Sequence, residues 1–368
     1  MKKRTLSKLR YLVLLSLAGI ISGCTDSTPD NDSSAQHFID IQFQQNLKIS
    51  TTYNGEELGP KGFKNKFYYN GGYYYYGTNY NELESKGKDC QLLKIDAETG
   101  KIVIMNQMSS WSTFYDLDFY QNSVIATFSG YSYIRILDSN TLSLVKVIKG
   151  KYVDVSGEEA SLQDSRGVAI FEDKVFSIIP EEHRVLIFKT TDFTQPQEDG
   201  DLMVAQGQLG VKNSMYDPID NKKSNLFCEP HKIEVMGNYL LIADKYKINV
   251  YDKNLTLVNT ITKVYSSGKS LELPISPTSF DFGLTNENHA FMRLKDSGKH
   301  YLIFFDPKNI TNGSSLPVFY CEEKSNSLID PNKNISPSIF ENQLIVNDNE
   351  GGVNIYDISE YRMTIKTQ

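Results

Sequence analysis

A short strand pattern that ends on aspartate and a turn recurs along the whole chain. Five copies are LLKID, IRILD, INVYD, LIFFD and VNIYD, which close on Asp96, Asp138, Asp252, Asp306 and Asp357. A sixth copy, VLIFK, ends on Lys189 instead of aspartate. Successive copies lie 42, 51, 63, 54 and 51 residues apart. A repeat of this length with strand-like alternation is typical of the blades of a β-propeller.

Each copy of this pattern is flanked by further strand-like segments. Two precede it, joined by tight polar turns such as Asn70-Gly71-Gly72, and one follows it. The following segments include residues 201–206 and 362–367. Six such groups predict an all-β fold, a six-bladed β-propeller of four-stranded antiparallel blades that occupies residues 37–368.

A propeller must also close its ring. Residues 37–43, HFIDIQF, read as a strand that precedes the first blade. We expect the N- and C-terminal strands to pair in the last blade. Residues 37–43 would then lie beside residues 362–367, or take their place, and cover an otherwise exposed edge.

Four consecutive tyrosines, residues 73–76, fit neither an amphipathic helix nor a half-buried strand. Blades pack face to face, so an inner strand is covered on both sides and becomes continuously apolar or aromatic. The run is therefore predicted to be packed between blades. The alternative is a stacking platform for sugar rings.

The N-terminus has the pattern of an export signal. Five basic residues within residues 1–10 precede an apolar run, residues 11–21, that is too short to span a bilayer. The run ends in Ile21-Ser22-Gly23-Cys24, which resembles the lipobox of bacterial lipoproteins. This resemblance implies cleavage before Cys24 and acylation of Cys24, including palmitate. The alternative is an ordinary signal peptide with a chance cysteine. Residues 24–36 are small and polar and are expected to form a flexible tether.

Charge and cysteine content exclude several kinds of partner. Removal of residues 1–23 changes the formal net charge from −7 to −12, and no basic cluster remains, which argues against nucleic acid. The other cysteines, Cys90, Cys228 and Cys321, are far apart and odd in number. They predict buried thiols or at most one disulfide, and no zinc site. We expect neither a cofactor nor a metal.

The third repeat carries the clearest family resemblance. Residues 157–189, GEEASLQDSRGVAIFEDKVFSIIPEEHRVLIFK, are similar to an NHL repeat in their Gly-Val-Ala and Arg-Val elements. With the lipobox, the chain resembles the six-bladed TolB-like and NHL-like propeller lipoproteins of Bacteroidota. That resemblance implies a cell-envelope location, anchored by lipid and usually in the outer membrane, on its periplasmic side or at the cell surface.

Loop lengths identify the face of the propeller that we expect to bind a ligand. Connections from a fourth strand to the next blade are long at residues 149–165, 207–230 and 263–277, and long ordered loops are usually functional. The candidate binding residues on this long-loop face are Trp111, Tyr115, Arg166, His183, Arg184, Glu229, His231 and Lys232. Asp116, Lys245, Lys247, His300 and Glu350 map to the same face. Each also has a simpler interpretation, as solvated surface, loop packing or a strand cap.

Two functions from different classes follow. The first is a binding module that presents its long-loop face to a partner protein, a peptide or a glycan in the envelope. The second is a lyase or hydrolase that uses His183, His231, Arg166 and Glu229 around the mouth of the central channel. The sequence contains no G-x-S-x-G, H-E-x-x-H or P-loop pattern, which favours the binding module.

Overall fold

The chain forms an assembly of β-sheets in a computed structural model. The structure describes residues 35–39, 42–50, 52–57, 65–79, 89–110, 113–128, 133–149, 151–162, 164–191, 202–215, 225–266, 269–273, 282–284, 290–296, 299–317, 319–320, 338–340, 343–347, 351–357 and 363–367. Strands dominate, with short 3-10 turns at Pro180–Glu182 and Pro307–Thr311. Among these residues, no helix has the length and apolar character needed to cross a membrane. The predicted signal peptide and most of the tether lie outside them.

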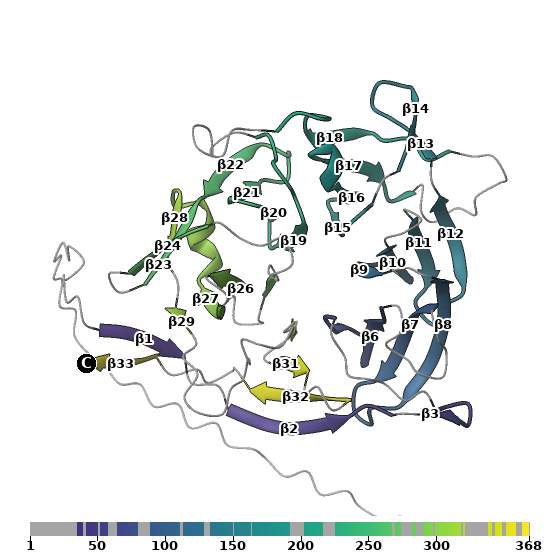
Figure 1. The fold of residues 1–368 in the computed structure, drawn as a ribbon, viewed down its shortest axis with the longest axis horizontal. Helices are drawn as coiled ribbons and strands as arrows, with labels where there is room; N and C mark the ends of the chain where they lie inside the picture. Colours follow the sequence, from purple (N-terminus) through teal and green to yellow (C-terminus); the bar gives the residue numbers. More distant parts are fainter. Residues whose placement is uncertain are drawn as a thin grey trace, which may run out of the picture.

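Five sheets have four antiparallel strands each (Figure 1). The first is β5 (Tyr68–Asn70), β6 (Tyr73–Gly77), β7 (Asp89–Asp96) and β8 (Ile102–Ser110). The second is β9 (Phe114–Tyr120), β10 (Ser123–Phe128), β11 (Tyr133–Asp138) and β12 (Leu144–Lys149). The third is β15 (Gly167–Phe171), β16 (Lys174–Ile179), β17 (Arg184–Lys189) and β18 (Gly207–Gly210). The fourth is β19 (Lys232–Met236), β20 (Tyr239–Asp244), β21 (Lys247–Tyr251) and β22 (Leu257–Ile261). The last is β30 (Ser338–Phe340), β31 (Gln343–Asn347), β32 (Gly352–Asp357) and β2 (Gln42–Lys48).

A larger sheet differs from these blades. It has six strands, in the order β25 (Phe282–Leu284), β26 (Ala290–Asp296), β27 (Lys299–Phe305), β29 (Phe319–Tyr320), β1 (Ala35–Ile39) and β33 (Met363–Thr367). The pairing of β1 with β29 is parallel. The prediction of six four-stranded blades is therefore wrong. Within the described residues the structure has five, because both chain ends extend the sheet that was expected to be the fifth blade.

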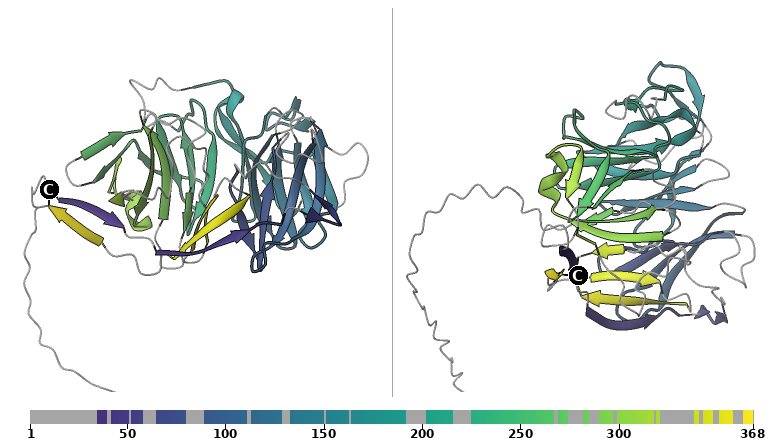
Figure 2. Two further views of the ribbon diagram at one scale, coloured as in Figure 1. Left: turned by 60° about the horizontal axis from the view of Figure 1, so that its bottom comes forward. Right: turned by 60° about the vertical axis from the view of Figure 1, so that its left-hand side comes forward.

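The sheets are arranged in a ring around their first strands (Figures 1 and 2). Strand β15 contacts β9 on one side and β19 on the other, and β25 contacts β19 and β30. The ring continues where the Phe67 amide donates to Ser338 Oγ at 3.0 Å, which joins the first blade to the last. The fold is thus an all-β propeller with four-stranded antiparallel blades, as the repeat predicted.

The N-terminal segment closes the ring through two strands. Strand β2 pairs antiparallel with β32, from Gln42 opposite Asp357 to Lys48 opposite Gly352, and becomes the outer strand of the last blade. Strand β1 pairs antiparallel with β33, from Ala35 opposite Thr367. Pairing of the N- and C-terminal strands is confirmed. The placement of residues 362–367 in the last blade is wrong, because β33 follows β1 into the six-stranded sheet.

The tyrosine run is packed between blades, as predicted. Tyr74 and Tyr76 are buried in a cluster with Ile345 and Ile355 of the last blade. Tyr75 points to the other side of the strand and packs with Val124 of the second blade. Burial raises the pKa of Tyr75 to about 12, and its hydroxyl donates to the Ser139 carbonyl at 2.9 Å. One strand thus needs aromatic side chains on both faces.

The recurring aspartate has a local structural reason. Asp96 Oδ1 accepts from the Glu98 and Thr99 amides at 3.2 and 2.8 Å and from the Thr99 hydroxyl at 2.7 Å. Asp138 makes the same three hydrogen bonds with Asn140 and Thr141. The carboxylate therefore accepts hydrogen bonds from the amides of the turn between the third and fourth strands. The bonds to Thr99 also lower the pKa of Asp96.

Three local predictions change in the structure. The fourth strand of the third blade is β18, not residues 201–206, where Val204 forms only an isolated parallel bridge with Val153. The long connection at residues 149–165 contains a hairpin, β13 (Lys151–Val153) with β14 (Glu159–Ser161). After β22, strand β23 (Lys263–Ser266) pairs antiparallel with β24 (Lys269–Glu272), and β23 also pairs with β28 (Ser315–Pro317). Small pairs such as β3 (Thr52–Tyr53) with β4 (Glu56–Glu57) complete the described strands.

Cys90 and Cys228 are free thiols. Cys90 is buried and its thiol donates to the Thr78 carbonyl at 2.7 Å, whereas Cys228 is half-buried. These two residues therefore do not form a disulfide with each other. Cys321 lies outside the described residues.

Candidate functional site

A buried carboxylate shapes the loop that enters the fourth blade. Asp244, at the end of β20, accepts from the amides of Cys228, Glu229 and Lys245 at 2.9, 2.6 and 2.9 Å. Burial raises the pKa of Asp244 in spite of these bonds. Because a buried carboxylate is costly without such partners, these bonds fix the backbone that carries Glu229 and Lys245.

Charged and aromatic side chains gather where the first strands of three consecutive blades begin. Arg166, directly before β15, donates from Nε to Asp164 at 3.1 Å and lies over the Tyr115 ring of β9, 5.9 Å from its centroid. Lys245 pairs with Glu229 at 3.4 Å. We call these five residues, Tyr115, Asp164, Arg166, Glu229 and Lys245, the strand-entry cluster. It lies at the long-loop end of the blades.

The side chains of the strand-entry cluster are accessible to solvent. Its charged groups stabilise one another as ion pairs. The side chains of Asp164, Arg166, Glu229 and Lys245 are 22%, 30%, 34% and 40% exposed. Burial alone would lower the pKa of Arg166, but the hydrogen bond to Asp164 raises it above its ordinary value. The neighbouring Tyr246 and the pairing with Glu229 raise the pKa of Lys245. The cluster thus presents fixed charges of both signs beside an aromatic ring.

A second, buried network lies deeper along the same strands. Asp116 Oδ1 accepts from the Tyr68 hydroxyl at 2.5 Å and from Lys232 Nζ at 2.9 Å. Glu234 Oε2 lies 3.6 Å from Lys66 Nζ and 4.0 Å from Lys232 Nζ. Lys232 is buried, and its bond to Asp116 links the fourth blade to the second. It was predicted as a binding residue, but the structure places it behind the accessible surface.

Asp118 is the strongly perturbed carboxyl of this network. Burial, and then the negative charge of Glu234, raise its pKa to about 7. Its Oδ2 accepts from the Ile170 amide at 2.7 Å, and its Oδ1 from the Phe119 amide at 2.7 Å. Asp118 therefore joins the second and third blades.

The two predicted histidines are held by backbone carbonyls. His231 is buried, its Nδ1 lies 3.0 Å from the Glu229 carbonyl oxygen, and burial lowers its pKa to about 4. His183 closes the turn Pro180–Glu182 with a left-handed backbone, φ 57°, and its Nδ1 lies 2.5 Å from the Cys228 carbonyl oxygen. Both side chains thereby tie their loops to neighbouring backbone.

Arg184 is fully buried in an ion cluster rather than offered to a ligand. Its Nη1 and Nη2 donate to the two oxygens of Asp154 at 2.8 and 3.1 Å, and its Nε donates to Glu182 at 2.7 Å. Tyr152 and Gln208 complete the set at 2.6 and 2.7 Å. We call Arg184, Asp154, Glu182, Tyr152 and Gln208 the arginine cluster. It joins β17 to the β13–β14 hairpin and to β18.

Four further predicted residues fall outside the groups described above. Trp111, Glu350 and Cys24 lie outside the described residues. His300 belongs to β27, whose backbone alone is described at that point. Within the described part of the chain, no three His, Cys, Asp or Glu side chains are grouped so that they could hold a metal ion.

Sequence reasoning found most of the strand-entry cluster. Tyr115, Arg166 and Glu229 were candidates, and Lys245 was placed on the same face. Asp164, which pairs with Arg166 two residues away, was missed. A charged residue two positions from a candidate arginine was the signal that could have found it.

Comparison with models of protein families and with curated proteins gives no match. Similar solved structures include the WD40 domain of Toxoplasma gondii coronin, at 12% identity and TM-score 0.46 over 90% of this chain and 76% of that one. The β-propeller domain of Myceliophteria thermophila Cps50 (Swd1) has 12% identity and TM-score 0.48, over 83% and 87%. The Neurospora crassa Pan2 WD40 domain has 11% identity and TM-score 0.46, over 93% and 94%. The β-propeller fold of this chain rests on its own ring of sheets.

Proposed function

We propose that this chain is a lipid-anchored protein of the cell envelope whose propeller binds a partner protein through the strand-entry cluster. The observation that carries the proposal is the composition of that cluster. It offers an arginine stacked on a tyrosine, with two carboxylates and a lysine around them, and its charged side chains are all partly exposed. Arginine and tyrosine are enriched at protein interfaces and at their energetic centres.

The anchor is proposed from the sequence. The basic and apolar segments of residues 1–21 and the Ile21-Ser22-Gly23-Cys24 pattern support lipidation of Cys24. Attachment to the outer membrane, on its periplasmic side or at the surface, agrees with the resemblance to Bacteroidota propeller lipoproteins. We also infer that the six-stranded sheet serves as the sixth blade, an inference supported by the contacts of β25 with β19 and β30.

The alternative of a lyase or hydrolase loses support from the contacts of its proposed residues. His183 and His231 each direct Nδ1 to a backbone carbonyl, and Arg166 and Glu229 are each engaged in an ion pair, with Asp164 and Lys245. These residues contribute to the structure of the loops. The binding hypothesis needs only the exposed atoms of the strand-entry cluster.

Site-specific crosslinking in cells tests the proposal. A photoreactive amino acid at Tyr115 is expected to capture a partner protein, whereas the same group at Lys253, in the opposite turn of the fourth blade, captures none. Purified partner should then bind Arg166→Ala and Lys245→Ala at least about tenfold more weakly than wild type. The matched control, Lys253→Ala, removes a lysine from the other end of the same blade and should bind normally.

Equal binding by Arg166→Ala and wild type would contradict the proposal. Turnover of a substrate that depends on His231 would instead favour the enzyme. Because exposed ion pairs contribute little stability, both cluster variants should fold as wild type does, and their melting temperatures check this.

A further inference from the structure

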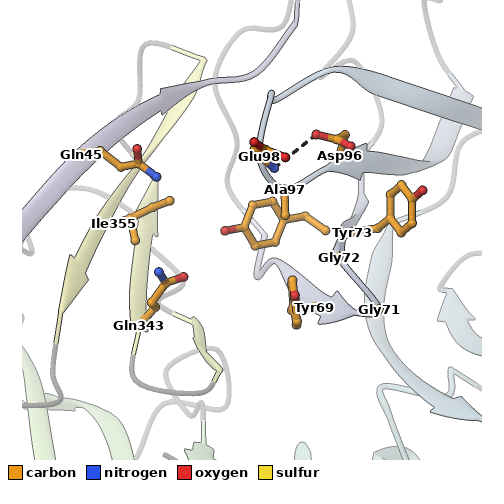
Figure 3. Close-up of a pocket in the computed structure, with 11 residues that line it drawn as sticks. Gln45, Tyr69, Gly71, Gly72, Tyr73, Asp96, Ala97, Glu98, Gln343 and Ile355 are labelled. Atoms are coloured by element: carbon orange, nitrogen blue, oxygen red, sulfur yellow. Dashed lines mark hydrogen bonds between the residues drawn. The ribbon is translucent and has the colours of Figure 1, made fainter. Parts of the chain in front are cut away.

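A cavity of about 500 Å³ lies between the first and last blades, at the end of the blades opposite the strand-entry cluster. Tyr69, Gly72, Asp96 and Glu98 line it from the first blade, and Gln45 and Gln343 from the last (Figure 3). We call it the seam cavity. Its volume is within the range of about 300–1,000 Å³ that is usual for small-molecule sites.

The first blade provides an aromatic wall and open backbone. Tyr69 is half-buried at the end of β5 and packs edge-on against Tyr74, with ring centroids 5.9 Å apart. The next turn contains Gly71 and Gly72, with φ of 58° and 86°, and no atom lies within 4 Å of where a Cβ would stand on either. The turn thus has no side chain above it beside a tyrosine, and its Gly72 carbonyl accepts from the Ala97 amide at 3.1 Å.

The last blade provides two amides on an irregular edge. Strand β2 shifts register between Phe43 and Gln45, so an extra residue bulges from the outer strand at the cavity. Gln343 is half-buried, and its Nε2 lies 3.4 Å from Gln44 Oε1. β-Bulges are frequent next to binding sites because they redirect side chains. An amide donates and accepts hydrogen bonds, so two amides can serve adjacent hydroxyl groups.

The two carboxylates have different roles. Asp96 Oδ1 already accepts three hydrogen bonds within its own turn. Glu98 is exposed at the top of that turn and reaches the cavity wall. Glu98 is therefore the carboxylate positioned for a ligand.

We propose that the seam cavity binds a neutral saccharide of one or two rings. The apolar face of a sugar would pack on Tyr69, and its hydroxyls would bond to Gln45, Gln343 and Glu98. The described lining residues include two carboxylates and no lysine or arginine, which disfavours a phosphate or another anion. This site is independent of the proposed protein-binding function, because it uses other residues at the other end of the blades.

A sugar in this cavity would contact both sides of the joint where the ring closes. Gln45 lies on the N-terminal strand β2, whereas Tyr69 and Glu98 belong to the first blade. A ligand that binds only the closed ring stabilises the folded state. Binding should therefore raise the melting temperature of the propeller.

Saturation-transfer NMR and thermal unfolding of the full-length chain, purified in a detergent without sugar groups, test the proposal. The probes are glucose, galactose, mannose, maltose, cellobiose and lactose, with inorganic phosphate as the anionic comparison. We expect saturable binding of at least one sugar with a rise in melting temperature, and no binding of phosphate. Gln343→Ala should raise the Kd about tenfold, the usual effect of a lost polar contact.

Two further variants test how much the charge of Glu98 contributes to sugar binding and whether its position matters. Glu98→Gln keeps hydrogen-bonding atoms and loses only the charge, so it should weaken sugar binding by only about threefold. Asn140→Ala is the matched control, because Asn140 occupies the same turn position in the second blade. Failure of every sugar to bind would overturn the proposal, as would equal binding by Gln343→Ala and wild type. Arg166→Ala should leave sugar binding unchanged, so this result and that of the crosslinking test are separable.

Discussion

Asp118 is half-buried, and its surroundings favour the protonated form of its carboxyl. Its pKa is raised from 3.8 to about 7 by burial and by Glu234. A carboxyl with a raised pKa contributes stability that is fully present below its ordinary pKa and is lost as the pH rises through the folded value. This contribution should therefore fall by up to about 4 kcal/mol between pH 4 and pH 7.

His231 changes the stability of the folded state with pH in the opposite direction to Asp118. Burial lowers its pKa from 6.5 to about 4, so the folded state resists protonation. Its contribution is present above its ordinary pKa and is lost as the pH falls toward 4, by up to about 3 kcal/mol. The two effects oppose each other over the same pH interval.

Asp118→Asn should separate the opposing effects of Asp118 and His231 on the pH dependence of stability. The amide imitates the protonated acid and can still accept from the Ile170 amide. The variant should match wild type near pH 4 and exceed its stability by a few kcal/mol at pH 8. Its own stability should fall less, or rise more, from pH 4 to 6.5 than that of wild type, because the loss from Asp118 no longer offsets the gain from His231. Urea unfolding across this range measures both, and an identical pH dependence of variant and wild type would show that Asp118 ionises normally.

At the scale of the elements, the arginine cluster links β17 to the β13–β14 hairpin and to β18. It fastens the β13–β14 hairpin to β17 through Asp154 and Tyr152, and the bond to Arg184 lowers the pKa of Asp154 to about 2 although burial works the other way. Removing one member of a buried ion cluster leaves the other charges without compensation. Arg184 therefore holds the β13–β14 hairpin together with the backbone bridge between Val153 and Val204.

Arg184→Met should destabilise the propeller by about 3–5 kcal/mol. Lys212→Met is the matched control, because Lys212 contacts the same carboxylates at 3.2 and 3.6 Å but is 38% exposed, and it should cost less than about 1 kcal/mol. Chemical unfolding compares the two. Equal stabilities would mean that Arg184 does not link these elements and would restore it as a candidate ligand contact.

Features that depend on residues close together in the sequence were predictable, whereas features that depend on residues far apart in the sequence were not. The aspartate repeat was readable because Asp96 bonds to residues two and three positions away. The ion cluster of Arg184 was not predictable in this way, because Asp154 lies 30 positions earlier. The seam cavity was not predictable, because it depends on Gln343 approaching Tyr69. Likewise, the pattern of residues 362–367 predicted a strand correctly but could not identify its sheet.

For the whole molecule, the proposed anchor and the propeller should be separable. Cys24→Ser removes the proposed lipid attachment, and each buried CH₂ group contributes about 0.8 kcal/mol to membrane binding. A chain of formal charge −12 cannot replace this through anionic lipids. We expect release from the membrane or an uncleaved precursor, with the melting temperature of the propeller unchanged. Normal cleavage together with retention after a high-salt wash would contradict the lipoprotein proposal.

The pairing of β2 with β32 has a consequence for the order of synthesis. Lys48 leaves the ribosome long before Gly352, its partner in the last blade. At roughly 5–20 residues per second, the interval is about 15–60 s. Throughout that time the edge of the early strand has no native neighbour, and such edges template aggregation. Delayed folding, or a chaperone that covers this edge, should therefore favour correct closure of the ring.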